Sequence, residues 1–118
     1  MRLDWIVRAV PGAVRTSGFG GDWKTSYGDM AIAVNGSSGS GTYTYSGGLL
    51  YGSVNGPVFS GTWAQSAGSG RNCATEFQGN KAWGGFVFTL NPDGRSFSGT
   101  WTYCLETIVS GTWDGTRP

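Results

Sequence analysis

The tripeptide glycine-threonine-aromatic occurs four times in this chain of 118 residues and constrains its fold more than any other feature. In an extended strand, side chains alternate between two faces, so the glycine and the aromatic residue share one face and the threonine lies on the other. A face that alternates small and large residues suits the interior of a small closed sheet, and a face of hydroxyl side chains suits solvent. The repeat therefore predicts β-structure with an aromatic interior. Its copies span residues 41–43, 61–63, 99–101 and 111–113.

The composition also favours an all-β fold. The chain has 22 glycines and an aromatic content of 14%, including 6 tryptophans, whereas residues that favour helices are scarce. Aromatic side chains bury large areas, so they compensate for a hydrophobic content of 38% in a chain long enough for one domain. Eight short alternating segments are predicted as strands: residues 23–34, 41–45, 49–54, 58–65, 73–78, 85–90, 97–106 and 108–113.

Short turns rich in glycine, asparagine and aspartate separate these segments. Asn-Gly and Asp-Gly pairs, such as residues 35–36 and 93–94, supply the positive φ that tight hairpins need. Loops this short join antiparallel neighbours, so we expect an up-and-down meander of seven or eight short strands. Closure into a small β-barrel is the most economical arrangement because it removes exposed edges, and a β-sandwich or roll is the alternative.

The chain divides into an irregular N-terminal segment, residues 1–21, and a barrel domain, residues 22–118. In the segment, residues 3–7 permit one short strand, and residues 17–21 are predicted to form a glycine-rich connector. The first ten residues are too charged for a signal peptide, and no stretch approaches the roughly 18 apolar residues of a membrane helix. The compartment stays open: secreted or periplasmic if a leader has been removed, and cytoplasmic otherwise.

Charge and residue types exclude several classes of function. A net charge of +1 with 13% charged residues indicates no surface for nucleic acid or an anionic membrane. The absence of histidine excludes histidine-based acid–base catalysis and the commonest metal ligand, and we expect neither metal nor cofactor. Cys73 and Cys104 either form a disulfide that closes a loop of about 30 residues or remain buried thiols that pack as small hydrophobic side chains.

The segment from Gly21 to Ile32 resembles the first strand and turn of avidin-type barrels, in which a Gly-x-Trp opening is followed by a glycine five residues after the tryptophan. The copies of the repeat follow at similar intervals, and the similarity covers about residues 21–113. The resemblance implies a small meander barrel of the avidin and streptavidin type, or more broadly of the lipocalin-like calycins.

The same resemblance bears on the ligand. In the avidin family an asparagine, a serine and a tyrosine hold the ureido oxygen of biotin, and the matching positions here are Thr25, Asp29 and Tyr43. Only Tyr43 keeps its type. An ionised Asp29 is an acceptor alone and would repel a carbonyl oxygen. The resemblance therefore implies the barrel without a biotin site.

Two tryptophans outside the complete repeats, Trp23 and Trp83, lie near the ends of predicted strands or turns and are expected at the mouth of the barrel. Aromatic side chains at a mouth stack on sugar rings or flat heterocycles, while a few polar groups fix the orientation. With Thr25, Asp29 and Tyr43 they make up the predicted ligand-binding set. We therefore expect a non-catalytic binding module for a carbohydrate or another small ring-bearing molecule, with the tryptophans of the repeat in the core.

Two other functions stay open on the sequence. The outer face rich in serine and threonine, the strand edges and the N-terminal segment suit a structural subunit that assembles with its own copies into a homo-oligomer. Glu76 and Glu106 follow the two cysteines by two or three residues, so a disulfide would bring together two carboxylates, as a small hydrolase needs. In the predicted strands, however, both glutamates lie on the face opposite the aromatic residues, which favours exposure of their side chains to solvent.

Overall fold

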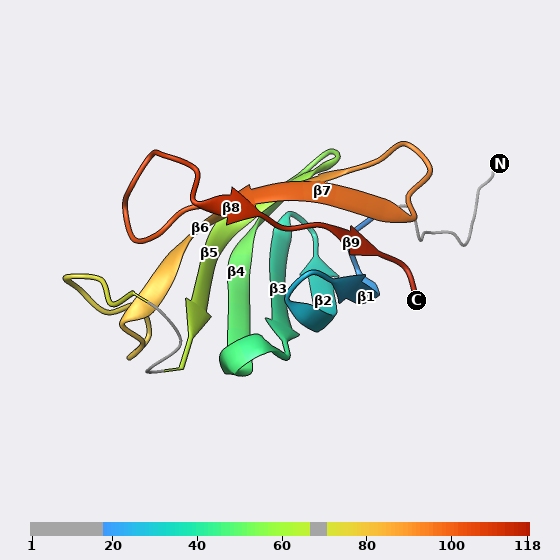
Figure 1. Ribbon diagram of the computed structural model, residues 1–118. Helices are drawn as coiled ribbons and strands as arrows, with labels where there is room; N and C mark the ends of the chain where they lie inside the picture. The colour runs from blue at the N-terminus through green and yellow to red at the C-terminus, as the bar shows by residue number, and fades with distance from the viewer. Residues whose placement is uncertain (1–17, 67–70) are drawn as a thin grey trace, which may run out of the picture.

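The computed structural model describes residues 18–66 and 71–118, which form antiparallel strands joined by turns and loops (Figure 1). A short 3-10 helix, η1, interrupts the meander after the third strand. The elements are β1 (Gly21–Thr25), β2 (Gly28–Asn35), β3 (Ser38–Tyr43), η1 (Tyr45–Gly47), β4 (Gly48–Asn55), β5 (Val58–Gln65), β6 (Ala82–Leu90), β7 (Ser96–Trp101), β8 (Gly111–Thr112) and β9 (Gly115–Thr116).

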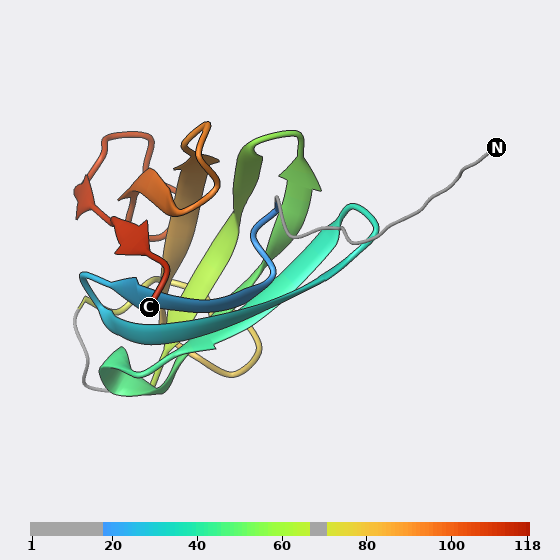
Figure 2. The ribbon, with the colours of Figure 1, turned by 90° about the vertical axis from the view of Figure 1, so that its right-hand side faces the viewer.

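Strands from β1 to β7 pair in the order in which they follow along the chain, as expected for a meander. β7 then pairs with β9, and β9 pairs with β1, so the sheet closes on itself. β8 and β9 are two short parts of the last strand, separated at Trp113 and Asp114. The result is a closed eight-stranded antiparallel barrel, which confirms the predicted fold class. Figure 2 shows the strands curving around a common interior.

Every second residue of the strands points into the barrel, and these positions hold most of the aromatic side chains. The ring of Phe88 stacks on Phe97 with centroids 4.4 Å apart and meets Trp113 edge to face at 5.2 Å. Such ring pairs add to the free energy gained from burying apolar area. The buried residues of the interior are Phe19, Trp23, Met30, Ile32, Tyr43, Leu50, Phe59, Trp63, Phe86, Phe88, Phe97 and Trp113.

The glycines of the repeat are required because the neighbouring strand occupies the space where a side chain would begin. A Cβ atom on Gly41 would lie 2.7 Å from the carbonyl oxygen of Ala31, and one on Gly99 would lie 2.6 Å from a ring carbon of Phe88. Real Cβ atoms do not approach other heavy atoms this closely. The alternation of small and large residues therefore lets neighbouring strands and aromatic rings approach one another closely.

Phe19 closes the end of the barrel at which the β4–β5 and β6–β7 turns lie. Its side chain is fully buried, and its ring lies 5.6 Å from Phe59 and 6.2 Å from Phe97 between centroids. The carbonyl oxygen of Phe19 accepts a hydrogen bond from Trp23 Nε1 at 2.8 Å. The side chain of Arg117 donates to the carbonyl oxygens of the residues on either side of Phe19.

The connector predicted over residues 17–21 therefore packs against the barrel wherever the structure describes it. The sequence interpretation overlooked a single aromatic ring among glycines, because one apolar residue carries no periodicity. The remaining expectations for the N-terminal segment, including a strand at residues 3–7, concern residues 1–17, which lie outside the described residues.

The prediction of a strand at residues 73–78 was wrong. These residues belong to the loop between β5 and β6, which contains one isolated bridge between Phe77 and Asn80. Cys73 and Phe77 instead pack with Trp83 in a small cluster on the outer face of the barrel. The alternation of apolar and polar residues over 73–78 therefore reflects packing against Trp83 and not a ladder of backbone hydrogen bonds.

Other predicted segments are shorter than expected or divided. The segment predicted at residues 23–34 is divided by a turn into β1 and β2, and the one at residues 97–106 ends at Trp101. Of residues 108–113, only β8 pairs, and residues 108–110 lie in an exposed loop. β9, which completes the closure of the barrel, was not predicted because two residues are too few to show a period.

Candidate functional site

A pocket lies at the open end of the barrel, opposite Phe19. Its cavity has a volume of about 160 Å³. The walls come from the β1–β2 turn, η1, the end of β5, the start of β6, the end of β7 with the loop that follows it, and Trp113 between β8 and β9. The lining residues are Tyr27, Tyr45, Trp63, Gln65, Ala82, Trp101, Tyr103 and Trp113.

The aromatic walls are held by edge-to-face contacts. Trp63 and Trp101 meet at an interplanar angle of 89° with centroids 5.7 Å apart, and Tyr103 lies 4.9 Å from Trp101. On another side Tyr27 lies 5.0 Å from Trp113. Edge-to-face packing is a favoured geometry for aromatic pairs, so each ring fixes its neighbour. The pocket is therefore a preformed aromatic site.

The three indole N–H groups of these walls already have partners inside the protein. Trp63 Nε1 donates to the carbonyl oxygen of Thr102 at 3.0 Å, and Trp101 Nε1 donates to the hydroxyl of Tyr27 at 3.1 Å. Trp113 Nε1 donates to Thr25 Oγ1 at 3.3 Å. The indoles therefore offer a ligand ring faces and edges, and its polar groups must be met elsewhere.

Among the described residues that line the pocket, Gln65 carries the buried polar side chain. It is 8% exposed, although its side chain carries two donors and an acceptor. Its Nε2 donates to the hydroxyl of Tyr43, which is also buried, at 2.9 Å. Within residues 18–66 and 71–118 we find no partner for Gln65 Oε1, for its second amide hydrogen or for the hydroxyl hydrogen of Tyr43. A buried polar group without a partner is costly, which points to a water molecule or a ligand at this position.

Burial raises the pKa of the Tyr43 hydroxyl well above its ordinary value of 10.0, and the hydrogen bond from Gln65 offsets this in part. The phenol therefore stays neutral over the physiological range and keeps a hydrogen to donate. Gln65 in the pocket wall and the phenol of Tyr43 behind it are therefore both uncharged at physiological pH.

Stability should fall at alkaline pH because of Tyr43. The pKa is higher in the folded state than in the unfolded chain, so the stabilisation is fully present below about pH 10 and declines as the pH rises further. One proton contributes a slope of about 1.4 kcal/mol per pH unit to the free energy of unfolding. We expect Tyr43→Phe to remove this slope in urea unfolding between pH 9 and 11. The matched variant Tyr51→Phe, on the outer face of β4, should keep the wild-type slope; equal slopes in all three proteins would contradict the assignment.

None of the five predicted ligand residues lines this pocket, although two of them contact its walls from behind. Trp23, Asp29 and Tyr43 instead border a second hollow, over β1, β2 and β3. Tyr43 lies behind Gln65, and Thr25 holds the indole of Trp113. Asp29 is exposed on the outer face of β2, where it pairs with Lys24 at 2.9 Å. Asp29 therefore does not reach the pocket.

Trp23 and Trp83 lie in packed clusters and not at the mouth where they were expected. Trp23 is buried at the closed end, edge to face with Phe97 at 5.0 Å. Trp83 is 9% exposed and packs against the outer-face cluster, where its Nε1 donates to the carbonyl oxygen of Thr75 at 2.8 Å. A position near the end of a strand was therefore not enough to place a tryptophan at the mouth of the barrel, because such a residue can also be buried at the closed end or covered on the outer face.

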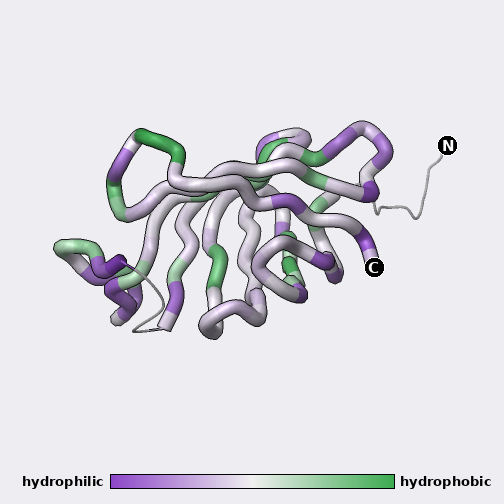
Figure 3. Tube along the Cα trace, viewed as in Figure 1, coloured by the Kyte–Doolittle hydropathy of each residue, from purple (hydrophilic) through white to green (hydrophobic). Residues whose placement is uncertain are grey.

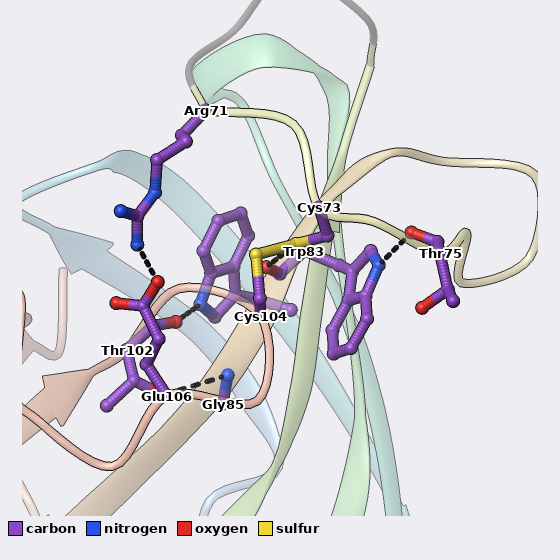
Figure 4. Close-up of a disulfide and its surroundings, with 9 residues drawn as sticks. Arg71, Cys73, Thr75, Trp83, Gly85, Thr102, Cys104 and Glu106 are labelled. Carbon is purple, nitrogen blue, oxygen red and sulfur yellow. Dashed lines mark hydrogen bonds and ion pairs between the residues drawn. A yellow bond between two sulfur atoms is a disulfide. The ribbon is translucent and has the colours of Figure 1, made fainter.

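Cys73 and Cys104 form a disulfide, which resolves the two alternatives for these residues (Figure 4). Glu76 and Glu106 are both exposed and lie in loops, so the strand phase argued from the sequence does not apply to them. Glu106 forms an ion pair with Arg71. This pairing gives Glu106 a structural partner.

The pocket residues missed by the sequence interpretation are the tyrosines of the rim, three tryptophans of the repeat that were assigned to the core alone (Trp63, Trp101 and Trp113) and, above all, Gln65. One signal for Gln65 was present, because it follows Phe59, Gly61 and Trp63 in the inward phase of β5. A polar residue at an inward position is unusual and marks a candidate site. The tyrosines carried no such signal, because Tyr27, Tyr45 and Tyr103 lie outside the strands, in a turn, in η1 and in a loop.

The described residues offer neither a cluster of metal ligands nor a membrane-spanning helix. In residues 18–66 and 71–118, no group of three or more acidic or cysteine side chains is arranged to hold a metal ion. No helix in this part of the chain is long and apolar enough to cross a membrane.

The fold and the pocket together define a small closed β-barrel with an aromatic-lined site at one end. Comparisons with models of protein families, with curated proteins and with solved structures found no match. The function must therefore be argued from the geometry of the pocket.

Proposed function

We propose that this protein is a non-catalytic binding module whose open-end pocket holds one neutral ring of a carbohydrate or another small ring-bearing molecule. The observation that carries the proposal is Gln65, a buried amide that faces an aromatic pocket with hydrogen-bonding capacity unused among the described residues. Aromatic walls with a few convergent polar groups are the usual composition of small-molecule sites.

The volume of the cavity limits the part of the ligand that enters. An apolar cavity of about 150 Å³ holds a benzene molecule, so about 160 Å³ accommodates one six-membered ring. Complete small-molecule sites usually measure about 300–1,000 Å³. A second ring or a chain would therefore remain outside the mouth, against the rim tyrosines.

The lining residues favour an uncharged ring. None of the described residues that line the cavity is Asp, Glu, Lys or Arg, so an ion would lose its hydration without gaining a partner. The edge of the ring should carry both a donor and an acceptor, which pair with Oε1 and with the second amide hydrogen of Gln65. Adjacent hydroxyls of a pyranose and the amide edge of a planar heterocycle both meet this requirement.

A relation to avidin-like or lipocalin-like barrels is part of the proposal. Its support is the meander topology, the Gly-x-Trp opening at Gly21–Trp23 and the position of Tyr43 at the open end. The polar partners differ from those expected from the resemblance, because Gln65 lies at the pocket and Asp29 does not.

Calorimetry and tryptophan fluorescence with two sets of neutral probes test this function. One set contains methyl glycosides of common hexoses, and the other contains planar amide rings such as uracil and nicotinamide. We expect binding from one set, with a change in tryptophan emission because three tryptophans line the pocket. Gln65→Met should weaken that binding by about 10- to 100-fold, since an unmet polar group costs about 1–3 kcal/mol.

Asp29→Asn is the matched control, because it alters a polar residue that lies outside the cavity. Its affinity should equal that of the wild type. The proposal fails if neither set binds at millimolar concentration, or if Gln65→Met binds as tightly as Asp29→Asn.

A further inference from the structure

We infer that the Cys73–Cys104 disulfide shapes the mouth of the open-end pocket, so that a dithiol reductant opens the site while the barrel stays folded. The inference concerns regulation of the pocket and rests on the proposed function for its biological meaning. Its structural content can be tested without any ligand.

The disulfide joins the two long loops at the open end, residues 71–81 and 102–110, which lie on the left in Figure 1. The backbone N–H of Cys104 donates to the carbonyl oxygen of Trp83 at 2.8 Å, and that of Cys73 donates to Lys81 at 2.7 Å. Figure 4 shows the bridge between these loops, above the outer face of β6. The disulfide is the covalent link that fixes one loop against the other.

The residues directly before Cys104 form part of the pocket wall. Tyr103 lines the cavity and packs edge to face against Trp63 and Trp101. The carbonyl oxygen of Thr102 accepts the indole hydrogen bond of Trp63. Thr102 is also bonded to Gly85 in β6, through its backbone N–H at 2.9 Å and its hydroxyl at 3.3 Å. The position of the wall therefore depends on these bonds and on how Cys104, at the other end of the segment 102–104, is held.

The loop after Cys104 contributes little packing that would hold this segment. Leu105 is 85% exposed, Ile108 is 79% exposed and Val109 is more than half exposed; they form the apolar part of the loop in Figure 3. Glu106 pairs with Arg71, but about half of each side chain is exposed, and such ion pairs contribute little. Segments with few buried contacts open locally at low cost.

The backbone conformation of Cys104 gives a second reason to expect that reduction of the disulfide releases the segment 102–104. Its φ is +56°, a left-handed conformation that a residue with a side chain adopts at a cost. The disulfide and the hydrogen bond to Trp83 hold it there. Once the disulfide is broken, relaxation of Cys104 to an extended conformation would move Tyr103 away from the wall.

The chemical step is thiol–disulfide exchange with a dithiol. A thiolate of the reductant attacks Cys104 Sγ, because Cys104 is half-buried and Cys73 is buried, and the S–S bond breaks with Cys73 leaving as a thiolate. The second thiol of the reductant then attacks its own sulfur in the mixed disulfide and releases Cys104. Both cysteines end as thiols, and the reductant ends as a cyclic disulfide after losing two electrons and two protons.

The barrel should survive this step. Its closure runs through β7, β9 and β1, and its interior cluster does not include either cysteine. The disulfide belongs to the separate outer-face cluster with Trp83. Reduction therefore releases the loops without removing a strand from the closed sheet.

Indole hydrogen exchange, followed by NMR in the full chain, tests the inference before and after addition of dithiothreitol. We expect exchange of the Trp63 indole hydrogen to accelerate about tenfold or more on reduction, because its acceptor lies in the released segment. The Trp23 indole, bonded to Phe19 at the closed end, should keep its protection and serves as the internal control.

A double variant, Cys73→Ser with Cys104→Ser, should show fast Trp63 exchange at all times and no response to dithiothreitol. Unchanged Trp63 exchange in the reduced protein would overturn the inference. Loss of Trp23 protection together with Trp63 would also overturn it, because the disulfide would then hold the whole barrel. A failed binding screen with the predicted exchange pattern would count against the proposed function alone.

Discussion

Gly61→Ala should destabilise the barrel by about 3 kcal/mol, a large part of the 5–15 kcal/mol that typical domains possess. Gly61 belongs to the second copy of the repeat and lies opposite Gly52 in the β4–β5 pair, so two inward glycines face each other. An added Cβ would overlap the carbonyl oxygen of Tyr51 and approach Gly52 Cα at 2.5 Å. These are backbone atoms of a paired strand, which cannot rotate away as a side chain can.

Urea unfolding of the variant measures this cost, and Gly20→Ala is the matched control. A Cβ atom on Gly20 would meet its nearest neighbours, in Ile32 and Val34, at 4.0 Å, which is ordinary contact. That variant should lie within about 1 kcal/mol of the wild type and can even be more stable, because alanine restricts the unfolded chain. If the two variants lose equal stability, the repeat is not explained by close approach of the strands.

Phe19→Ala should cost about 3–5 kcal/mol, the usual penalty for removing a fully buried phenylalanine. Its ring fills the closed end between Phe59 and Phe97, so truncation leaves a cavity at that end. The emission of Trp23, which lies 6.5 Å from Phe19 between ring centroids, should shift to longer wavelength as water approaches it.

The control for Phe19 is Val87→Ala, which trims an apolar side chain on the outer face of β6 where it is 45% exposed. We expect a change of about 0.5 kcal/mol there, as for most surface substitutions. A loss below about 1 kcal/mol for Phe19→Ala would show that the ring does not close the barrel and that residues 18–20 are a connector, as the sequence suggested.

Alternation and turn residues predicted most of the meander. The segment at residues 58–65 coincides with β5, and the buried Trp63 and Trp113 lie inward, as the period of two requires. The two elements that the sequence missed share one physical cause. A strand of two residues, such as β9, and a single buried ring, such as Phe19, contain too few positions to show a period.

The candidate site was less predictable than the fold. Tyr43 was chosen because it matches the tyrosine that holds the ligand in the avidin family, and it lies behind Gln65, which lines the pocket. Trp83 was chosen because it breaks the repeat, yet the loop that carries Cys73 covers it. The sequence offers no local signal that Trp83 is covered. The covering contact is made on the outer face of the barrel, where the disulfide joins Cys73 to Cys104, two residues that lie far apart in the chain.

By itself, the sequence determined the all-β class, the antiparallel meander and the inward direction of the repeat aromatics. These properties follow from local rules, namely the alternation of side chains along a strand and the turn preferences of glycine and asparagine. The tertiary structure alone decided which end is closed by Phe19 and which end is open around Gln65. The physical reason is that a barrel end is built from several strands at once, so its shape depends on register and loop packing that no single segment encodes.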